Sequence, residues 1–165
     1  MKVHLKRATQ GVFLACVLTS PISFALEVGD AIDTKTAAAL NLPTDKVAVV
    51  DFFAEWCESC RKELPLISKL NTRLGGDEVE FIGVDTDDSE AVAIAFQQEL
   101  TSQGNLNFNV INDTDQSIVS TFQPLGFPAL YIIKNNKIVG AHIGAVDGID
   151  LAIENDLKRL METQP

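Results

Sequence analysis

The chain has 165 residues, 46% of them hydrophobic, with 13 basic and 23 acidic side chains and a net charge of −10. That length suits one domain with a proper core, and the negative charge argues against nucleic acid or an anionic membrane surface as partner. Three cysteines are too few for a disulfide-stapled scaffold. Structural zinc is disfavoured because there is no second cysteine pair and His142 is the only histidine after residue 25.

Residues 1–25 have the pattern of a secretory signal peptide. Three basic residues precede a short apolar run at 11–18, and Ser23 and Ala25 are small residues at the expected cleavage positions. We expect cleavage after Ala25, which leaves a single domain over 26–165. An uncleaved anchor and lipidation at Cys16 are the alternatives, although the apolar run is short for a membrane span. Export implies a compartment in which disulfides persist.

An apolar run followed by two cysteines is the most informative stretch. A short helix is expected at 36–42, and residues 47–53 then form a nearly continuous series of β-branched and aromatic residues. Such a run is typical of a strand that is covered on both faces. After Cys57 the apolar residues follow helical spacing until Gly75. The pair Cys57 and Cys60 is therefore predicted where a central strand turns into a helix.

This position gives the two cysteines different chemistry. Unpaired N–H groups and the helix dipole stabilise a thiolate at Cys57, which lowers its pKa and makes it a nucleophile. Cys60 lies one turn later on the same face, where it can attack a mixed disulfide at Cys57 and release the partner. Arg61 and Lys62 favour the thiolate and Glu58 opposes it, and the sequence leaves open which effect prevails.

Residues 51–60, with Pro65 downstream, resemble the active-site segment of thioredoxin. The form Trp-Cys-x-x-Cys-Arg-x-Glu-x-Pro is more similar still to the TlpA/ResA-like thiol-disulfide oxidoreductases of the bacterial cell envelope, and Glu63 falls on the glutamate of that group. Ser59 departs from the pattern, because proline is usual there. The resemblance implies an α/β, thioredoxin-like fold, in which a central mixed sheet has helices on both faces. The N-terminal hairpin usual in that group is expected to be reduced or absent.

Two acids have candidate roles in moving protons. In thioredoxin the residue that matches Asp51 is buried and relays protons to the resolving thiol, so the resemblance implies this role here. The alternative is a solvated aspartate at a sheet edge. Glu63 lies one helical step from Cys60 and could tune either thiol, or it could be an ordinary solvated glutamate of the helix.

The rest of the chain alternates between strand and helix patterns, which indicates an α/β domain. The acids at 87–90 are suited to capping the helix that follows them. Asn135-Asn136 predicts a hairpin turn. The expected elements are a strand at 79–85, a helix at 91–100, a short strand at 108–111, a short helix at 117–122, strands at 130–134 and 137–142, and a last helix at 147–161.

Pro128 precedes one of these strands. The resemblance implies a cis peptide bond beside the cysteines, with the Phe127 backbone free to pair with an extended substrate. An ordinary proline at a strand entry is the alternative. Trp56 is expected to shield the site and supply a contact surface, although it could also belong to the core. His142 is expected to face solvent.

Together these features predict a thiol-disulfide oxidoreductase whose redox group is the Cys57–Cys60 disulfide, so no other cofactor is needed. The resemblance implies a periplasmic reductant, free or anchored to the membrane. Its partners would be protein thiols and disulfides, such as those of apocytochrome c or a metalloprotein, and a membrane electron donor. The alternatives are an oxidant or isomerase of DsbA type, and a non-catalytic Cu(I)-binding or chaperone module that uses the same cysteines.

Overall fold

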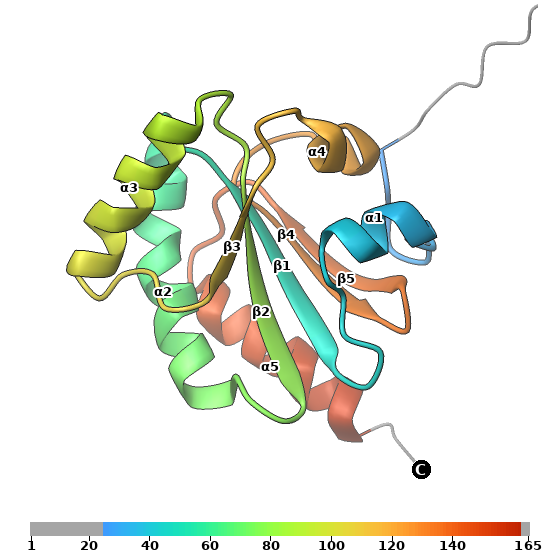
Figure 1. Ribbon diagram of the computed structural model, residues 1–165. Helices are drawn as coiled ribbons and strands as arrows, with labels where there is room; N and C mark the ends of the chain where they lie inside the picture. The colour runs from blue at the N-terminus through green and yellow to red at the C-terminus, as the bar shows by residue number, and fades with distance from the viewer. Residues whose placement is uncertain (1–24, 163–165) are drawn as a thin grey trace, which may run out of the picture.

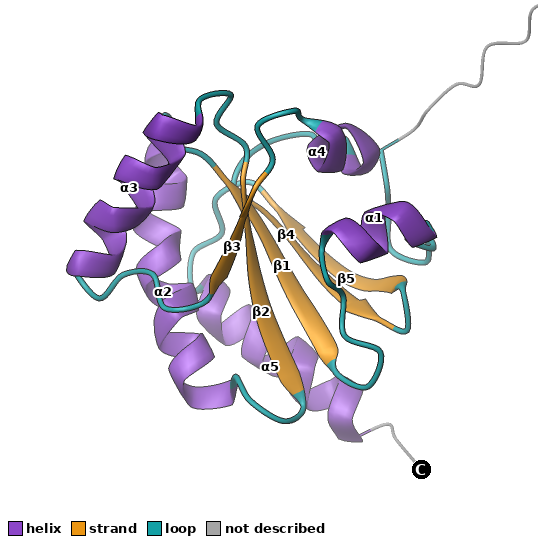
Figure 2. Cartoon of the chain, in the orientation of Figure 1, coloured by secondary structure: helices purple, strands orange, loops and turns teal. Residues whose placement is uncertain are grey.

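The computed structural model describes residues 25–162 and contains a five-stranded sheet (Figures 1 and 2). The strand order is β3-β2-β1-β4-β5. β1, β2 and β3 are parallel to one another, whereas β4 and β5 are antiparallel to their neighbours, so the sheet is mixed as predicted. The strands are β1 (Val47–Phe53), β2 (Val79–Asp85), β3 (Asn109–Asn112), β4 (Ala129–Lys134) and β5 (Lys137–Ile143).

Helices cover both faces of this sheet. α1 and α4 lie on one face, α2 and α5 lie on the other, and α3 packs beside α2 (Figure 1). Each face has its own buried apolar cluster, and β1 contributes side chains to both. The helices are α1 (Thr34–Ala39), α2 (Glu58–Leu74), α3 (Glu90–Ser102), α4 (Ser117–Phe122) and α5 (Ile149–Glu162).

The alternation of β1 determines where its one acid points. Val47 and Val49 belong to the cluster beneath α2 and α5, whereas Val50 and Phe52 belong to the cluster beneath α1 and α4. Because side chains alternate between the faces of a strand, Asp51 points to the same side as Val49, toward α2. Asp51 also lies in the middle strand of the sheet, so the alternative of a solvated aspartate at a sheet edge is wrong.

Three chain segments meet at one edge of the sheet. The parallel strands β1 and β2 both end there, with Phe53 paired to Asp85. β4 is antiparallel to β1 and begins at the same edge, where Ala129 pairs with Phe52. The β1–α2 loop, the β2–α3 loop and the segment before β4 are therefore neighbours, although they are far apart in the sequence.

Most predicted elements are present, with boundaries shifted by a few residues. The 36–42 helix is instead Thr34–Ala39, which Asp33 caps through two backbone N–H groups. In the described residues before α1 there is an isolated bridge between Ala31 and Lys137 but no hairpin. His142 does not face solvent as expected, because its Nε2 lies 2.8 Å from the Asp156 carboxylate on α5.

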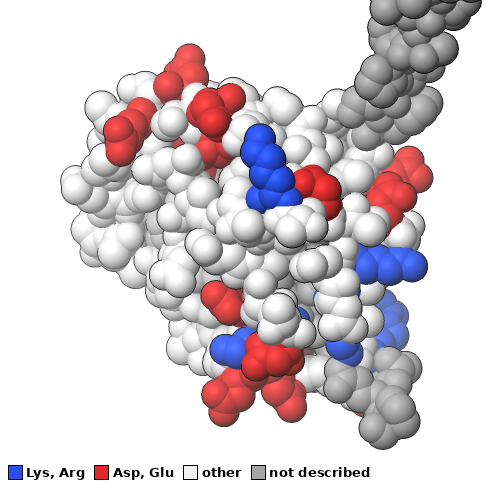
Figure 3. Space-filling model, turned by 45° about the vertical axis from the view of Figure 1, so that its right-hand side comes forward, with Lys and Arg blue, Asp and Glu red and all other residues white. Residues whose placement is uncertain are grey.

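The predicted signal peptide lies almost wholly outside the described residues. Within residues 25–162, no helix is both long enough and apolar enough to cross a membrane. On the face seen in Figure 3, acidic side chains gather at several places and a broad uncharged area lies between them.

Candidate functional site

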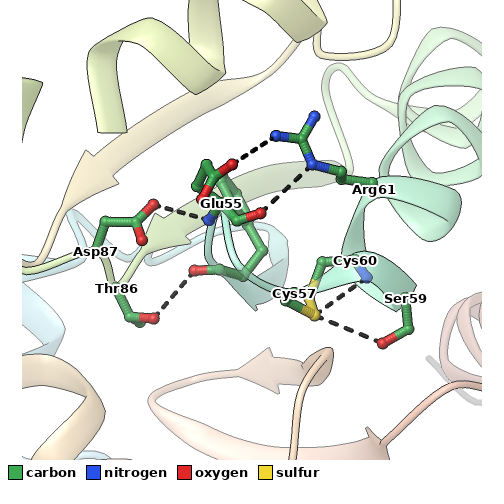
Figure 4. Close-up of a disulfide and its surroundings, with 8 residues drawn as sticks. Glu55, Cys57, Ser59, Cys60, Arg61, Thr86 and Asp87 are labelled. Carbon is green, nitrogen blue, oxygen red and sulfur yellow. Dashed lines mark hydrogen bonds and ion pairs between the residues drawn. A yellow bond between two sulfur atoms is a disulfide. The ribbon is translucent and has the colours of Figure 1, made fainter. Parts of the chain in front are cut away.

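Cys57 and Cys60 form a disulfide at the start of α2, with their Cα atoms 5.2 Å apart (Figure 4). Cys57 is the N-cap of the helix, and its Sγ accepts a hydrogen bond from the Cys60 backbone N–H at 3.1 Å. The Ser59 hydroxyl lies 3.5 Å from the same sulfur. Cys60 is completely buried and Cys57 nearly so. The sulfur predicted to be the nucleophile thus sits where backbone N–H groups stabilise a thiolate.

The charged side chains around the disulfide are largely compensated. Lys62 forms an ion pair with Glu58 at 2.7 Å, and this contact lowers the pKa of the Glu58 carboxyl. Arg61 pairs with Glu55 and with Glu99 of α3, each at 3.0 Å. Because Arg61 and Lys62 are both paired with acids, little net charge remains at this end of α2 to raise or lower the pKa of Cys57. The helix terminus itself is then the main local stabiliser of a Cys57 thiolate.

Asp51 and Glu63 form a buried acidic pair. Asp51 is 1% exposed and Glu63 6% exposed, so the alternative of a solvated helix glutamate at Glu63 is wrong. Among the described residues, neither carboxyl oxygen of Asp51 has a hydrogen-bond partner. Burial, and then repulsion from Glu63, raises the pKa of Asp51 well above its ordinary value. Burial raises the pKa of Glu63 to about 7.

A cavity of about 190 Å³ adjoins Glu63. Its wall includes Ser59 and Glu63 from α2 and the segment 145–149 that leads into α5. Glu63 thus lines this cavity, whereas Asp51 is enclosed in the core and does not.

The segment before β4 borders the disulfide on another side. The Phe127–Pro128 peptide bond is cis, as predicted. Phe127 packs against the cluster that contains both cysteines, and its ring meets Trp56 edge-on with centroids 5.4 Å apart. Trp56 is 64% exposed and Leu125 is 92% exposed, so Trp56 does not belong to the core. These side chains give the site an apolar, accessible rim.

Asp87 belongs to the surroundings of the site although the sequence suggested only helix capping for it. The N-cap of α3 is Ser89, whose side chain makes no capping bond. Instead the Asp87 carboxylate accepts the backbone N–H of Glu55 at 2.8 Å (Figure 4). The signal that could have revealed this contact is positional, because Asp87 follows the strand that is parallel and adjacent to β1.

Metal ligands are sparse in this part of the molecule. Within residues 25–162 there is no group of three or more His, Cys, Asp or Glu side chains that could hold a metal ion. A Cu(I) site built on the cysteine pair would consequently have to rely on those two sulfurs.

Comparison with known proteins gives both a family and a set of relatives. The model of the AhpC/TSA family matches residues 21–142. The thiol-disulfide oxidoreductase ResA of Bacillus anthracis is 30% identical over 100 residues, which is 60% of this chain and 56% of that protein. ResA of Bacillus subtilis is 28% identical over 102 residues, covering 61% and 55%. The chain thus spans about half the length of the curated relatives it matches.

Solved structures agree on the fold. A DsbE-type thiol:disulfide interchange protein from Chlorobium tepidum superposes with a TM-score of 0.66 at 21% identity, covering 82% of this chain and 98% of that one. StoA from Bacillus subtilis gives a TM-score of 0.61 at 17% identity, with 71% and 86% covered. These likenesses establish the thioredoxin-like fold that the resemblance implied.

Proposed function

Since the chain belongs to the AhpC/TSA family and has a thioredoxin-like fold with a CxxC disulfide, we propose that it is a thiol-disulfide oxidoreductase acting on other proteins. The observation that carries this proposal is the Cys57–Cys60 disulfide at the N-terminus of α2. The apolar rim formed by Trp56, Leu125 and Phe127 supports it, because an unfolded or extended polypeptide offers matching apolar side chains.

The reaction proceeds in two exchange steps. In the reduced protein, the Cys57 thiolate attacks one sulfur of the partner's disulfide, which forms a mixed disulfide and expels the partner's other sulfur as a thiolate. The Cys60 thiolate then attacks Cys57 Sγ, which forms the Cys57–Cys60 disulfide and frees the partner's second thiolate. Two electrons pass from the protein to the partner, whose disulfide becomes two thiols after protonation.

The buried acids manage the protons of these steps. Cys60 has no access to solvent, so its proton must leave through the interior before it can attack. Asp51 receives this proton and Glu63 passes it to the adjoining cavity. Burial raises the pKa of Glu63 to about 7, which suits this task because a proton acceptor works best when its pKa is near the ambient pH. Burial also raises the pKa of Asp51 well above its ordinary value.

In the direction that we propose, the protein is a reductant in the bacterial cell envelope. The similarity to ResA supports this direction, and the signal-like pattern of residues 1–25 supports export, with 26–165 as the mature domain. Its partners would be protein disulfides, including those of apocytochrome c or a metalloprotein. A membrane protein would return the electrons.

Equilibration of residues 26–165 in a glutathione series tests the proposal. A reduction potential well below about −220 mV supports a dedicated reductant, whereas a value near −120 mV is that of a strong oxidant and would reverse the direction. If no disulfide forms at any glutathione ratio, the exchange function itself is wrong.

Trapping variants test the order of the two thiols. Cys60→Ser is expected to accumulate a mixed disulfide with a reducible protein substrate, and Cys57→Ser is expected to form none. Ser59→Ala is the matched control, since it changes a neighbouring side chain and leaves both thiols in place. Equal trapping by the two cysteine variants would contradict the assignment of Cys57 as nucleophile.

A further inference from the structure

Glu55 is held at three points just before Trp56 and Cys57. Its backbone N–H donates to Asp87 Oδ2 at 2.8 Å. Its backbone carbonyl accepts from Arg61 Nε at 3.4 Å, and its carboxylate pairs with the same guanidinium at 3.0 Å. Figure 4 shows Asp87 and Arg61 approaching Glu55 from different elements. Glu55, which leads into the disulfide, is therefore held from the β2–α3 loop by Asp87 and from α2 by Arg61.

The β2–α3 loop that supplies Asp87 is itself well anchored. Asp87 is 5% exposed, and its backbone N–H donates to Asp85 Oδ1 at 3.1 Å. The other Asp85 oxygen accepts from Gln97 on α3 at 2.9 Å. Thr86 donates both its backbone N–H and its hydroxyl to the Phe53 carbonyl, at 2.9 and 3.1 Å. Two consecutive residues of this loop thus hold neighbouring parts of the chain, since Thr86 bonds the last residue of β1 and Asp87 bonds the β1–α2 loop.

Asp87 would ordinarily be explained as part of the start of α3. The contacts argue against that explanation, because the carboxylate accepts the backbone N–H of Glu55, 32 positions earlier, and no backbone N–H of α3. Burying a carboxylate is costly unless its oxygens are well paired. An ionised acceptor also forms a stronger bond to a backbone N–H than a neutral one does. The side chain is therefore suited to holding the β1–α2 loop.

We propose that Asp87 is a positioning residue that fixes Glu55 and thereby sets the orientation of Trp56 and Cys57. Trp56 is largely exposed and has one aromatic neighbour, Phe127, so its backbone attachment largely decides where its ring stands. Loss of the Asp87 bond removes the anchor on the Glu55 backbone N–H and leaves Glu55 held from the side of Arg61 alone. The ring then moves more widely and the approach of a partner's disulfide to Cys57 becomes less well defined.

Trp56 provides a direct readout because it is the only tryptophan in the chain. Time-resolved fluorescence anisotropy of the oxidised protein is expected to show a larger fast-decaying component in Asp87→Ala than in the wild type. Asp87→Asn keeps an acceptor oxygen of the same size and is expected to restore most of the wild-type decay. Asp88→Ala is the matched control, since Asp88 is the exposed neighbour and makes none of these contacts.

Two results would overturn the proposal. One is an anisotropy decay in Asp87→Ala that equals that of the wild type. The other is an equal increase of the fast-decaying component in Asp87→Asn and Asp87→Ala, which would show that the hydrogen bond does not cause the change. If Asp87→Ala does not fold, amide hydrogen exchange of the wild-type protein still decides. The Glu55 amide is expected to exchange slowly despite its place beside an exposed side chain, and exchange at the rate of an unstructured peptide would exclude the bond.

The catalytic consequence rests on the proposed exchange function. Asp87→Ala is expected to slow reduction of a protein disulfide by roughly tenfold, because small misplacements of reacting groups cost large factors in rate. Asp87→Asn and Asp88→Ala are expected to stay near the wild-type rate. An unchanged rate in Asp87→Ala with a loosened Trp56 would contradict the positioning of Cys57. Absence of thiol-disulfide exchange in the wild type would instead refute the proposed function. The anisotropy would still test whether the hydrogen bond from Glu55 to Asp87 orients Trp56.

Discussion

Glu63 shows how one residue of the site links chemistry to stability. Its carboxyl lies in the wall of the cavity and is almost fully buried, which raises its pKa from 4.5 to about 7. In the unfolded chain the same group ionises near its ordinary value. The folded protein therefore binds a proton at Glu63 over a pH range in which the unfolded chain does not.

The sign of the resulting pH dependence follows from proton linkage. A carboxyl whose folded pKa is raised contributes stability that is complete below about pH 4.5 and is lost as pH rises toward 7. Glu63→Gln is expected to remove this loss, because glutamine stays uncharged at every pH. The variant should match the wild type near pH 4 and exceed its free energy of unfolding by roughly 3 kcal/mol near pH 8, as measured by urea denaturation of the oxidised protein.

Glu78→Gln is the control for this experiment, because Glu78 is exposed, lies just before β2 and does not line the cavity. It removes the same formal charge and is expected to leave the pH dependence of the wild type unchanged. Asp51 still adds a slope of the same sign in both variants, since its pKa is raised too. Parallel stability curves for Glu63→Gln and the wild type would show that Glu63 does not hold its proton in the folded protein.

At the scale of elements, Gly83 allows β2 to pass beneath the aromatic ring that ends β1. A Cβ atom at Gly83 would stand 2.9 Å from Phe53 and 3.1 to 3.2 Å from Val110 and Phe108. Phe53 in turn meets Phe96 of α3 edge-on, with ring centroids 6.1 Å apart. The absence of a side chain on β2 is therefore part of how α3 and the disulfide end of α2 pack together.

Gly83→Ala is expected to destabilise the protein by about 1–3 kcal/mol, which is the usual cost of overpacking a dense core. The free energy of unfolding in urea measures this change. Gly126→Ala serves as the control, because no atom lies within 4 Å of a Cβ there, and its effect should stay within about 0.5 kcal/mol. Equal effects of the two substitutions would mean that the core around Gly83 accommodates an added methyl group, and that contact with Phe53 does not exclude a side chain there.

The elements also show which parts of the fold can be predicted from the sequence. β1, β2 and α4 have the bounds that the apolar patterns predict, because continuous apolar runs and helical spacing are local signals. The start of α5 does not follow from a local signal in this way. The pattern predicts a start at Asp147, but the helix begins at Ile149. Local patterns report which residues are buried, but the last turn at each end depends on neighbouring elements.

The candidate site was predictable where a motif carried it, as for Cys57, Cys60 and the cis bond at Pro128. Asp87 and His142 were assigned wrongly for a shared physical reason. Each bonds a partner on another element, 32 and 14 positions away in the chain, and no periodicity or composition reports such a pairing. A polar residue just beyond a central strand is where tertiary contacts most readily replace the local capping role.

At the scale of the whole molecule, the acidic excess should influence the choice of partner. The net charge is −10, and acidic side chains gather at several places on the face in Figure 3. Arg61 and Lys62, the bases beside the disulfide, are paired with acids and do not reverse this field. A cationic partner is therefore attracted during encounter and an anionic partner is repelled.

Two peptides with the same disulfide and apolar core, one flanked by lysines and the other by glutamates, measure this effect. The lysine peptide is expected to react about tenfold faster at low ionic strength. The two rates should converge near 1 M salt, where charges are screened beyond about 3 Å. Equal rates at low salt would contradict electrostatic selection and leave the apolar rim as the main determinant of partner choice.

Paired charge variants separate the total charge from its local arrangement. Asp88→Asn with Glu90→Gln removes two exposed acids beside the disulfide end of the sheet, whereas Asp45→Asn with Glu78→Gln removes two exposed acids at the opposite end. Both double variants change the net charge equally. Near 0.15 M salt the screening length is about 8 Å, so only the first pair should weaken the preference for the lysine peptide. Equal weakening by both pairs would mean that partners respond to the total charge of the protein, and that the acids at the disulfide edge have no special role.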